Sequence, residues 1–318
     1  MRVSSSRIRL ALLLLLGLGS SFANTPARAL EPDYSGLQDL LRQYTRVLPV
    51  AKGQPYDARF DYEQLYIDED IWHTHRADRL ATLHGVLLSA DPGTMSERER
   101  TAWALNTYNL LVIERLTLGL LVPGRKFMRF DSPKQLHDDF GSFFGAPVAK
   151  VGGRDYSIAG FERWFVYGDT SADPTGDGSV PRQRPGDPRL QFALHRAALC
   201  GGLAIPWVYR ADSLEAQLDR ATRLALALPR FIRADEAAGQ LLASNRFFDE
   251  RADFGGSDMT GLVPFLSRHA PSAMRRFLST RRITRVSQFF EPDWKLDQFD
   301  HPAPKLPGAF GAPPPPKP

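Results

Sequence analysis

The feature that most constrains the fold is one long helix expected in the first half of the chain. Ser96 and Glu99 have the spacing of a capping box, and an apolar run from Ala102 to Val122 follows them. Apolar residues occur all round this helix, so we expect it to be buried on most sides. Polar residues interrupt the run, which therefore does not suit a membrane span. Other elements must pack against several faces of this helix.

Two asparagines share one face of that helix. Asn106 and Asn109 are three residues apart, and a buried amide without hydrogen-bond partners costs about 1 to 3 kcal/mol. Two interpretations stay open. In one, the amides tie the helix to the backbone of a neighbouring segment; in the other, they line a binding site.

A second stretch, DPRLQFALHRAALCGGLAIPWVY at residues 187–209, contains the single cysteine of the chain. Its LQFAL part predicts a short buried strand, because it is almost wholly apolar and follows a turn-forming Asp-Pro pair. Cys200 precedes two glycines, which allow a sharp turn. A lone thiol at such a turn is either a buried small side chain or a nucleophile, and both interpretations stay open.

Apolar residues at helical spacing predict further helices on both sides of these two stretches. We expect helices at residues 34–48, 76–88 and 214–228, a turn with a short helix at 156–165, short helices at 261–267 and 272–278, and a possible strand at 282–297. Asp212 and Glu215 have the spacing of a second capping box. This pattern is typical of a helix-rich α+β domain with a small sheet.

Both ends of the chain differ in composition from the part between them. Residues 1–29 combine early arginines, a leucine-rich run and Ala-Arg-Ala, which predicts a cleaved secretory signal peptide and a periplasmic or secreted protein. The apolar run is about half the 20 residues of a membrane span, so we expect no transmembrane anchor after cleavage. Residues 301–318 are proline-rich and predict a disordered tail. Residues 30–300 are expected to form one globular domain.

Charge and motifs exclude several classes of partner and cofactor. The chain has 40 basic and 36 acidic residues, and the excess lies in the signal peptide, so we expect no nucleic-acid partner. One cysteine cannot form an internal disulfide. His73 and His75 share a face only on a strand, and no third ligand follows at typical spacing, so no metal site is expected. Nucleotide, dinucleotide, serine-hydrolase and zinc-protease motifs are missing from the sequence, which predicts no cofactor.

Several segments, taken in order, resemble one family, the proteins known as domain of unknown function 547 (DUF547). AWALNTYNLL at residues 102–111 is similar to that family's A-F-W-I-N-x-Y-N-A-L helix. The resemblance continues through VGG at 151–153, Phe161-Glu162, DPRLQFAL at 187–194, LEAQLD at 214–219, DFG at 253–255 and PDWKLD at 292–297. It implies a single helix-rich α+β domain organised around the Asn-x-Tyr-Asn helix, with a polar site.

The same resemblance points to an altered site. The family pattern has a His at the start of H-F-A-L, where this chain has Gln191. The family pattern also has a Cys-Pro just after H-F-A-L, and the spacing to Tyr209 places Gly201, not Cys200, opposite that cysteine. A slip of one residue in the alignment would place Cys200 there instead. Both departures favour a degenerate site in an exported member of the family.

The candidate site consists of polar residues from these segments. The binding residues are Asn106, Asn109, Glu162, Arg189 and Gln191, and Cys200 at the edge is the candidate catalytic residue. A nucleophilic Cys200 needs a base within about 3 Å, and His195 points away from it on either a helix or a strand. Gly201 and Gly202 are favourable, because they could offer backbone N–H groups to an oxyanion.

Three functions stay open. We expect a non-catalytic binding or structural role in the cell envelope, with a small molecule or an envelope component as the partner. The alternative is a thiol-dependent hydrolase or transferase that uses Cys200. Carboxylate chemistry through Glu162, Asp249 or Asp253 would require the fold to bring these groups within about 5 to 10 Å of one another.

Overall fold

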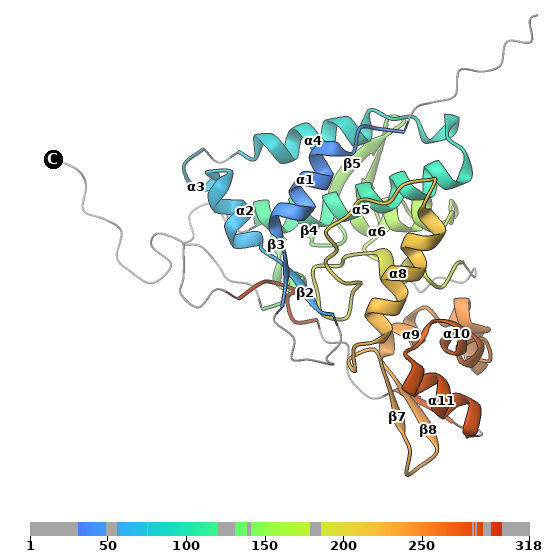
Figure 1. The fold of residues 1–318 in the computed structure, drawn as a ribbon. Coiled ribbons are helices and arrows are strands. Elements are labelled where there is room, and N and C mark those ends of the chain that lie inside the picture. The colour runs from blue at the N-terminus through green and yellow to red at the C-terminus, as the bar shows by residue number, and fades with distance from the viewer. Residues whose placement is uncertain are drawn as a thin grey trace, which may run out of the picture.

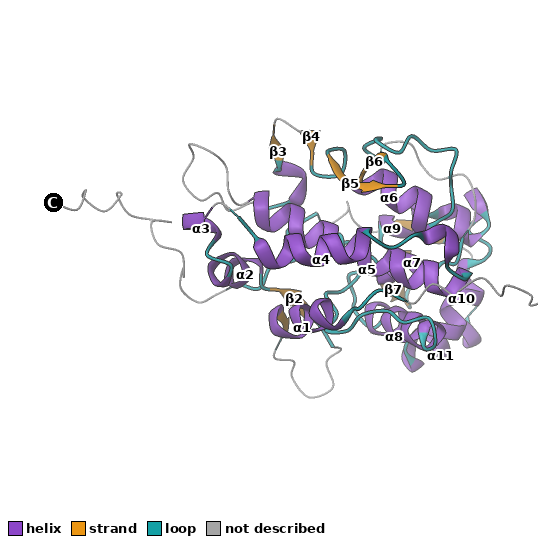
Figure 2. Ribbon diagram, turned by 90° about the horizontal axis from the view of Figure 1, so that it is seen from above, coloured by secondary structure: helices purple, strands orange, loops and turns teal. Residues whose placement is uncertain are grey.

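The computed structural model describes residues 31–48, 56–74, 76–119, 131–138, 141–178, 186–281, 283, 285–288 and 294–300. The predicted signal peptide at 1–29 and the tail at 301–318 lie outside these residues. Helices dominate, and the strands form small separate sheets, so the predicted α+β class is confirmed (Figures 1 and 2). Within the described part of the chain, no helix is both long and apolar enough to cross a membrane.

The predicted central helix is α5 (Glu97–Gly119). Its capping box forms as expected: the Ser96 N–H donates to Glu99 Oε2 at 2.8 Å, and the Glu99 N–H donates to Ser96 Oγ at 3.4 Å. The residues between Ala102 and Ile113 are all buried, which confirms burial on most sides. The elements packed against it are α2 (Tyr62–Asp68), α4 (Asp78–Leu88), α6 (Ile158–Phe161) and the π-helix η3 (Glu162–Val166).

The N-terminal helix is shorter than expected. The chain forms α1 (Ser35–Tyr44), and the end of the predicted helix is instead strand β1 (Thr45–Val47). β1 pairs antiparallel with β2 (Ala58–Phe60), with Thr45 opposite Phe60. Next come α2, the short helix α3 (Ile71–Thr74) and, before α5, the 3₁₀ turn η1 (Pro92–Thr94).

Two hairpins precede the stretch at 187–209. The first pairs β3 (His137–Asp138) with β4 (Gly141–Ser142) after the 3₁₀ turn η2 (Pro133–Gln135), and the second pairs β5 (Pro147–Val151) with β6 (Arg154–Ser157). Gly152 and Gly153 form the turn of the second hairpin at φ of 56° and 79°, values that side chains rarely adopt. The predicted short helix that contains Phe161 and Glu162 follows as α6 and η3.

The prediction of a strand at LQFAL is wrong. Leu190–Ala193 form one helical turn, α7, whose four side chains are buried. The preceding turn imposes this conformation, because the Arg189 N–H donates to Asp187 Oδ1 at 2.9 Å and the Leu190 N–H donates to the Asp187 carbonyl at 3.1 Å. No strand among the described residues pairs with this segment.

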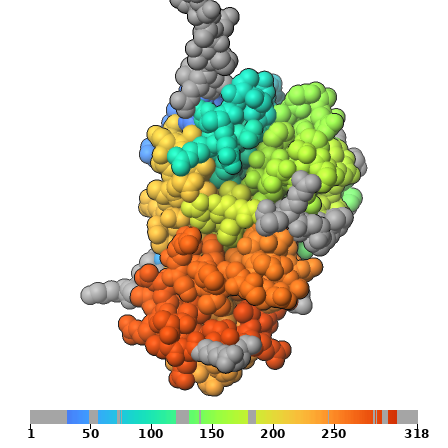
Figure 3. Space-filling model, turned by 90° about the vertical axis from the view of Figure 1, so that its right-hand side faces the viewer, coloured from blue at the N-terminus to red at the C-terminus, as the bar shows by residue number. Residues whose placement is uncertain are grey.

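The C-terminal part packs against α7. Its elements are α8 (Leu214–Leu226), β7 (Ile232–Asp235), β8 (Gln240–Ala243), α9 (Asn245–Asp249), η4 (Arg251–Phe254), η5 (Gly256–Asp258), α10 (Leu262–His269), α11 (Ser272–Thr280) and β9 (Val286–Gln288). Phe192 of α7 lies against Phe231, Phe247 and Phe265, with ring centroids 5.8 to 6.1 Å apart. In Figure 3 the orange C-terminal part lies below the teal and green parts.

Helices α8, α10 and α11 match the predictions, whereas two details do not. The capping box of Asp212 and Glu215 does not form, because Ser213 is the N-cap and makes no side-chain cap. The described strand near the C-terminus is only Val286–Gln288, which pairs parallel with β8.

Candidate functional site

Both asparagines of α5 bind backbone of the 187–209 stretch. Asn106 Nδ2 donates to the Tyr209 carbonyl at 2.8 Å, and its Oδ1 accepts from the Tyr209 N–H at 2.8 Å. Asn109 does the same one turn later: Nδ2 donates to the Ala193 carbonyl at 3.1 Å and Oδ1 accepts from the His195 N–H at 2.8 Å. Each side-chain amide thus satisfies one backbone C=O and one backbone N–H of the stretch, as the backbone of a neighbouring strand would in a sheet. The two side chains thus fix both ends of the stretch to α5.

Tyr108, between the two asparagines, lies beside a group of buried charged residues. Glu162 of η3 accepts a hydrogen bond from Arg196 Nη2, and the same Nη2 lies 3.6 Å from Glu250 Oε1. Arg246 Nη1 lies 3.5 Å from that Glu250 oxygen. Burial, followed by the Glu162 carboxylate, raises the pKa of Tyr108 well above its usual value. We call Tyr108, Glu162, Arg196, Arg246 and Glu250 the arginine cluster.

Arg246 is the unusual member of the arginine cluster. Its side chain is 5% exposed, yet among the described residues Nε and Nη2 have no hydrogen-bond partner. These two nitrogens lie on the same edge of the guanidinium plane, the edge that grips a carboxylate with two parallel hydrogen bonds. Two arginines face two glutamates, so the cluster is balanced in charge while one donor edge stays unused.

Cys200 lies beside this cluster. The thiol is partly buried, and burial raises its pKa to about 11, although Arg246, Arg196 and Lys134 act in the opposite direction. No imidazole hydrogen-bonds to the thiol within the described part of the chain. At neutral pH the group is therefore a thiol, not the thiolate that a nucleophile requires.

A cysteine at Gly201, where the spacing to Tyr209 places that of the family pattern, would require the loop to shift. A Cβ atom at Gly201 would lie 2.8 Å from Arg196 Cβ and 2.9 Å from the Arg196 backbone nitrogen. A Cβ at Gly202 would lie 2.4 Å from the Phe192 carbonyl oxygen. The loop of this chain is thus folded closely around two residues without side chains.

Of the other predicted site residues, Arg189 and Gln191 lie outside the arginine cluster. Arg189 donates to Asp187, Glu215 and Asp219, at distances of 2.6 to 3.0 Å, and these carboxylates raise its pKa. Glu215 is bound in this network, which accounts for the missing capping box on α8. Gln191 is buried, and its Nε2 donates to the Pro188 carbonyl at 3.1 Å.

A second buried network surrounds His195. Its Nε2 lies 2.6 Å from the Tyr62 hydroxyl, and its Nδ1 lies 3.6 Å from Asp297 Oδ2. Burial lowers the pKa of His195 to about 4 and raises that of Asp297 to about 7, although Arg59 opposes the second shift. His195 is thus hydrogen-bonded to Tyr62 and lies close to Asp297, and among the described residues no hydrogen bond joins it to Cys200.

The residues considered for metal binding and for carboxylate chemistry lie as follows. No group of three or more His, Cys, Asp or Glu side chains among the described residues could hold a metal ion. Residues 71–74 are helical, and His75 lies outside the described residues. Of the three carboxylates considered for catalysis, Glu162 and Asp249 lie near the two arginines, and burial raises the pKa of Asp249. Asp253 accepts from the Gly186 N–H at 2.7 Å.

The sequence predicted Glu162 and Cys200 in this region but not Arg196, Arg246 or Glu250. Arg196 directly follows His195, and the other two lie in the aromatic and acidic segment SNRFFDE, far along the chain. Arg246 and Glu250 are four residues apart, a spacing typical of helical ion pairs, but no spacing connects this pair with Arg196 or Glu162. The available signal for Arg196 was composition, because an arginine in a predominantly apolar segment must be paired with acidic groups or bind a ligand.

Comparison with known proteins gives one match. Residues 92–224 match the family model described as "Protein of unknown function, DUF547". The match begins at η1, includes α5, α6, η3 and α7, and ends within α8. No curated protein and no solved structure matches the chain.

Proposed function

Residues 92–224 match the DUF547 family model, and we propose that the chain belongs to this family, that it is exported and that it binds a small carboxylate in the arginine cluster, without thiol catalysis. The single observation that carries this proposal is the unused Nε–Nη2 edge of Arg246. A buried guanidinium edge without partners is unfavourable, and a carboxylate would satisfy both donors at once.

The surroundings of Arg246 fit a small, singly charged ligand. The two glutamates already neutralise the two arginines, and the nearby Lys134 and Asp249 offset each other, so a bound carboxylate would add one negative charge. Cys200 is partly buried and Asp249 is exposed, and they mark the side from which a ligand would reach the cluster. Tyr108 offers a buried hydroxyl as a further donor.

The location in the cell envelope rests on the N-terminal sequence. We infer that residues 1–29 are removed during export and that the mature protein is periplasmic or secreted. The partner is then a small molecule or envelope component that carries a carboxylate. N-terminal sequencing of the exported protein should give Leu30 as the first residue; a retained Met1 would contradict export by cleavage.

Thermal unfolding in the presence of acetate tests the binding proposal. Acetate should raise the melting temperature relative to chloride at equal ionic strength, because a ligand that binds only the folded state stabilises it. Acetamide, which is neutral and lacks the second carboxylate oxygen, should have a much smaller effect. Equal effects of acetate and acetamide would contradict the proposal.

Two variants identify the residue responsible for acetate binding. Arg246→Lys keeps the charge but removes the two-donor edge, so the stabilisation by acetate should be lost. Arg268→Gln removes an exposed arginine of α10 and should respond like wild type. Circular dichroism at 20 °C checks that both variants are folded. An unchanged acetate effect in folded Arg246→Lys would refute this site.

The alternative is a thiol-dependent hydrolase or transferase, and the positive charges of Arg246, Arg196 and Lys134 near Cys200 favour it. Its test is the rate of iodoacetamide labelling against pH. We expect labelling at pH 8 to be about 100-fold slower than in the urea-unfolded chain, because a pKa higher by two units lowers the thiolate fraction by that factor. Faster labelling in the folded than in the unfolded chain well below pH 8 would support the thiol enzyme instead.

A further inference from the structure

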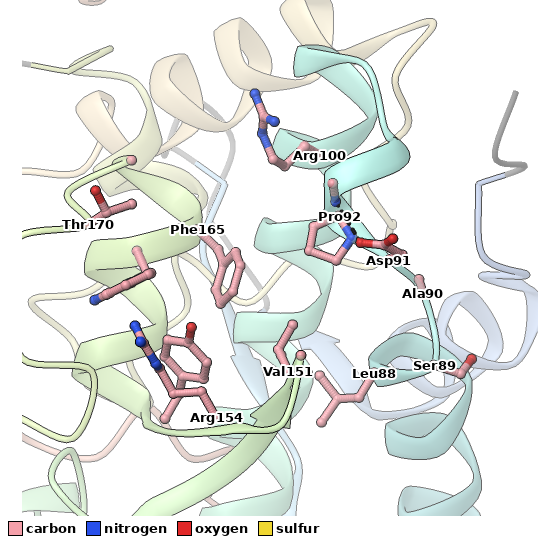
Figure 4. A pocket seen from close by; sticks show the side chains of 15 residues that line it. Leu88, Ser89, Ala90, Asp91, Pro92, Arg100, Val151, Arg154, Phe165 and Thr170 are labelled. Carbon is pink, nitrogen blue, oxygen red and sulfur yellow. Dashed lines mark hydrogen bonds between the residues drawn. The ribbon is translucent and has the colours of Figure 1, made fainter. Parts of the chain in front are cut away.

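A pocket lies away from the arginine cluster, near the N-terminal end of α5. It has a volume of about 740 Å³ and lies between the α4–η1 connection, the first turns of α5, the β5–β6 turn and η3 (Figure 4). This volume is within the range of sites that bind drug-sized molecules. The pocket shares no residue with the arginine cluster, although η3 contributes to both.

Aromatic side chains form one wall of the pocket. Tyr156 lies against Trp164 and Phe165, with ring centroids 5.6 and 5.1 Å apart. Trp164 Nε1 donates to the Ala172 carbonyl at 2.8 Å, and Phe165 packs edge-on against Trp103 at 5.2 Å. These contacts hold the rings in place without a ligand. Such a wall offers a rigid apolar surface at little cost in side-chain entropy.

Two exposed arginines flank this wall. The Arg154 guanidinium lies over the Trp164 ring, 4.8 Å from its centroid, and Arg100 projects from α5 on the other side (Figure 4). Neither guanidinium has an ion pair or a side-chain hydrogen bond within the described residues. Asp91 is the one carboxylate in the described lining, and its Oδ1 accepts from the Gly93 N–H at 2.8 Å. The lining therefore carries a net positive charge and free guanidinium donors.

We propose that this pocket binds an amphipathic organic anion, a molecule that joins an aromatic ring system to a sulfonate, carboxylate or phosphate group. The ring system would pack against Tyr156 and Phe165, and the anionic group would accept hydrogen bonds from Arg100 and Arg154. A purely apolar ligand would leave both guanidinium groups unpaired, and a small inorganic anion would leave the aromatic wall exposed. This site is independent of carboxylate binding at Arg246.

A fluorescent naphthalene sulfonate, 1-anilinonaphthalene-8-sulfonate, has this chemistry and serves as the probe. Titration into the protein that begins at Leu30 should give saturable, blue-shifted fluorescence. The neutral analogue N-phenyl-1-naphthylamine should bind at least about tenfold more weakly, because hydrogen bonds to charged groups are among the stronger ones. Equal affinity of the two probes would overturn the proposal.

Variants assign the probe to this pocket. Arg100→Gln and Arg154→Gln should each weaken sulfonate binding several-fold while leaving the neutral probe unaffected. Arg98→Gln removes an exposed arginine of the same helix that does not line the pocket, so it should bind like wild type. Both lining residues are exposed, so these variants should fold, and melting curves verify this.

Two further outcomes decide between this pocket and other sites. Trp164→Phe should reduce energy transfer from tryptophan to the bound probe, since Trp164 lines the pocket. Arg246→Lys should leave probe affinity unchanged, which separates this site from the arginine cluster. Probe affinity that falls equally in Arg98→Gln, or that is unchanged in both lining variants, would overturn the proposal.

Discussion

The asparagines and the tyrosine of the Asn-x-Tyr-Asn helix make different kinds of contact. Asn106 and Asn109 hold the backbone of the 187–209 stretch, whereas Tyr108 contributes its buried hydroxyl to the arginine cluster. The sequence motif therefore combines two structural amides with one residue at the candidate site. The four hydrogen bonds of these amides all go to backbone atoms of the 187–209 stretch. This agrees with the interpretation that the amides tie the helix to a neighbouring segment.

Replacement of Asn109 should destabilise the protein strongly. Asn109→Ala leaves the Ala193 carbonyl and the His195 N–H buried without their partners, and each such group costs about 1 to 3 kcal/mol. We expect the free energy of unfolding to fall by about 2 to 4 kcal/mol, measured by urea denaturation. Arg98→Ala, on the exposed side of the same helix, should change it by less than about 0.5 kcal/mol. A similar small loss for both variants would show that the amide is dispensable.

Residue type alone predicted part of the site. Asn106 and Asn109 were found because two amides in an apolar helix require partners wherever the helix packs. Arg246 was missed because only its pairing with Glu250 is local, whereas the other charged members of the cluster, Arg196 and Glu162, come from distant parts of the chain. No spacing in the sequence encodes such contacts.

At the scale of elements, the sequence predicted the long helices and failed at the short segments. α5, α8, α10 and α11 have enough turns for a helical period to appear, and α5 has a capping box that forms. Leu190–Ala193 is too short for its apolar run to distinguish a strand from a buried helical turn. Asp187 accepts hydrogen bonds from the N–H groups of Arg189 and Leu190, and these favour the helical turn. Glu215 binds Arg189 and therefore does not cap α8.

A cysteine at Gly201, in the turn after α7, should destabilise the protein. In Gly201→Cys the new Cβ would lie within 3 Å of Arg196 Cβ and of its backbone nitrogen, so the loop must shift. We expect a loss of about 1 to 3 kcal/mol in the free energy of unfolding. Gly85→Ala in α4 is the control: nothing lies within 4 Å of its Cβ, and alanine should stabilise the helix by about 0.4 to 1 kcal/mol. A Gly201→Cys variant as stable as wild type would show that the loop can accept the family arrangement.

At the scale of the whole molecule, the His195 network connects three distant parts of the chain. Tyr62 comes from the N-terminal part, His195 from the middle and Asp297 from the C-terminal segment. Backbone contacts reinforce this connection: the Phe60 N–H donates to the Asp297 carbonyl at 3.3 Å, and the Asp297 N–H donates to the Ala197 carbonyl at 2.9 Å. The C-terminal segment is therefore an integral part of the fold.

The pH dependence of stability should reveal this network. The pKa of Asp297 rises from 3.8 to about 7 on folding, so its contribution to stability is present below pH 3.8 and is lost as pH rises through 7. The pKa of His195 falls from 6.5 to about 4, so its contribution is present above pH 6.5 and is lost as pH falls through 4. Between pH 4 and 6.5 the folded pair and the unfolded pair each hold one proton, and the two contributions cancel.

Asp297→Asn should therefore change how the free energy of unfolding depends on pH. The variant keeps only the His195 contribution, so its free energy of unfolding should fall, relative to wild type, by about 1.4 kcal/mol for each pH unit below 6.5. From pH 6.5 to 7.5 wild type should lose stability that the variant does not lose. Urea denaturation at half-unit steps from pH 4.5 to 7.5 measures both effects, with Asp155→Asn, an exposed carboxylate, as the control. Parallel curves for wild type and Asp297→Asn would mean that Asp297 is ionised in the folded protein, paired with Arg59 at 3.1 Å.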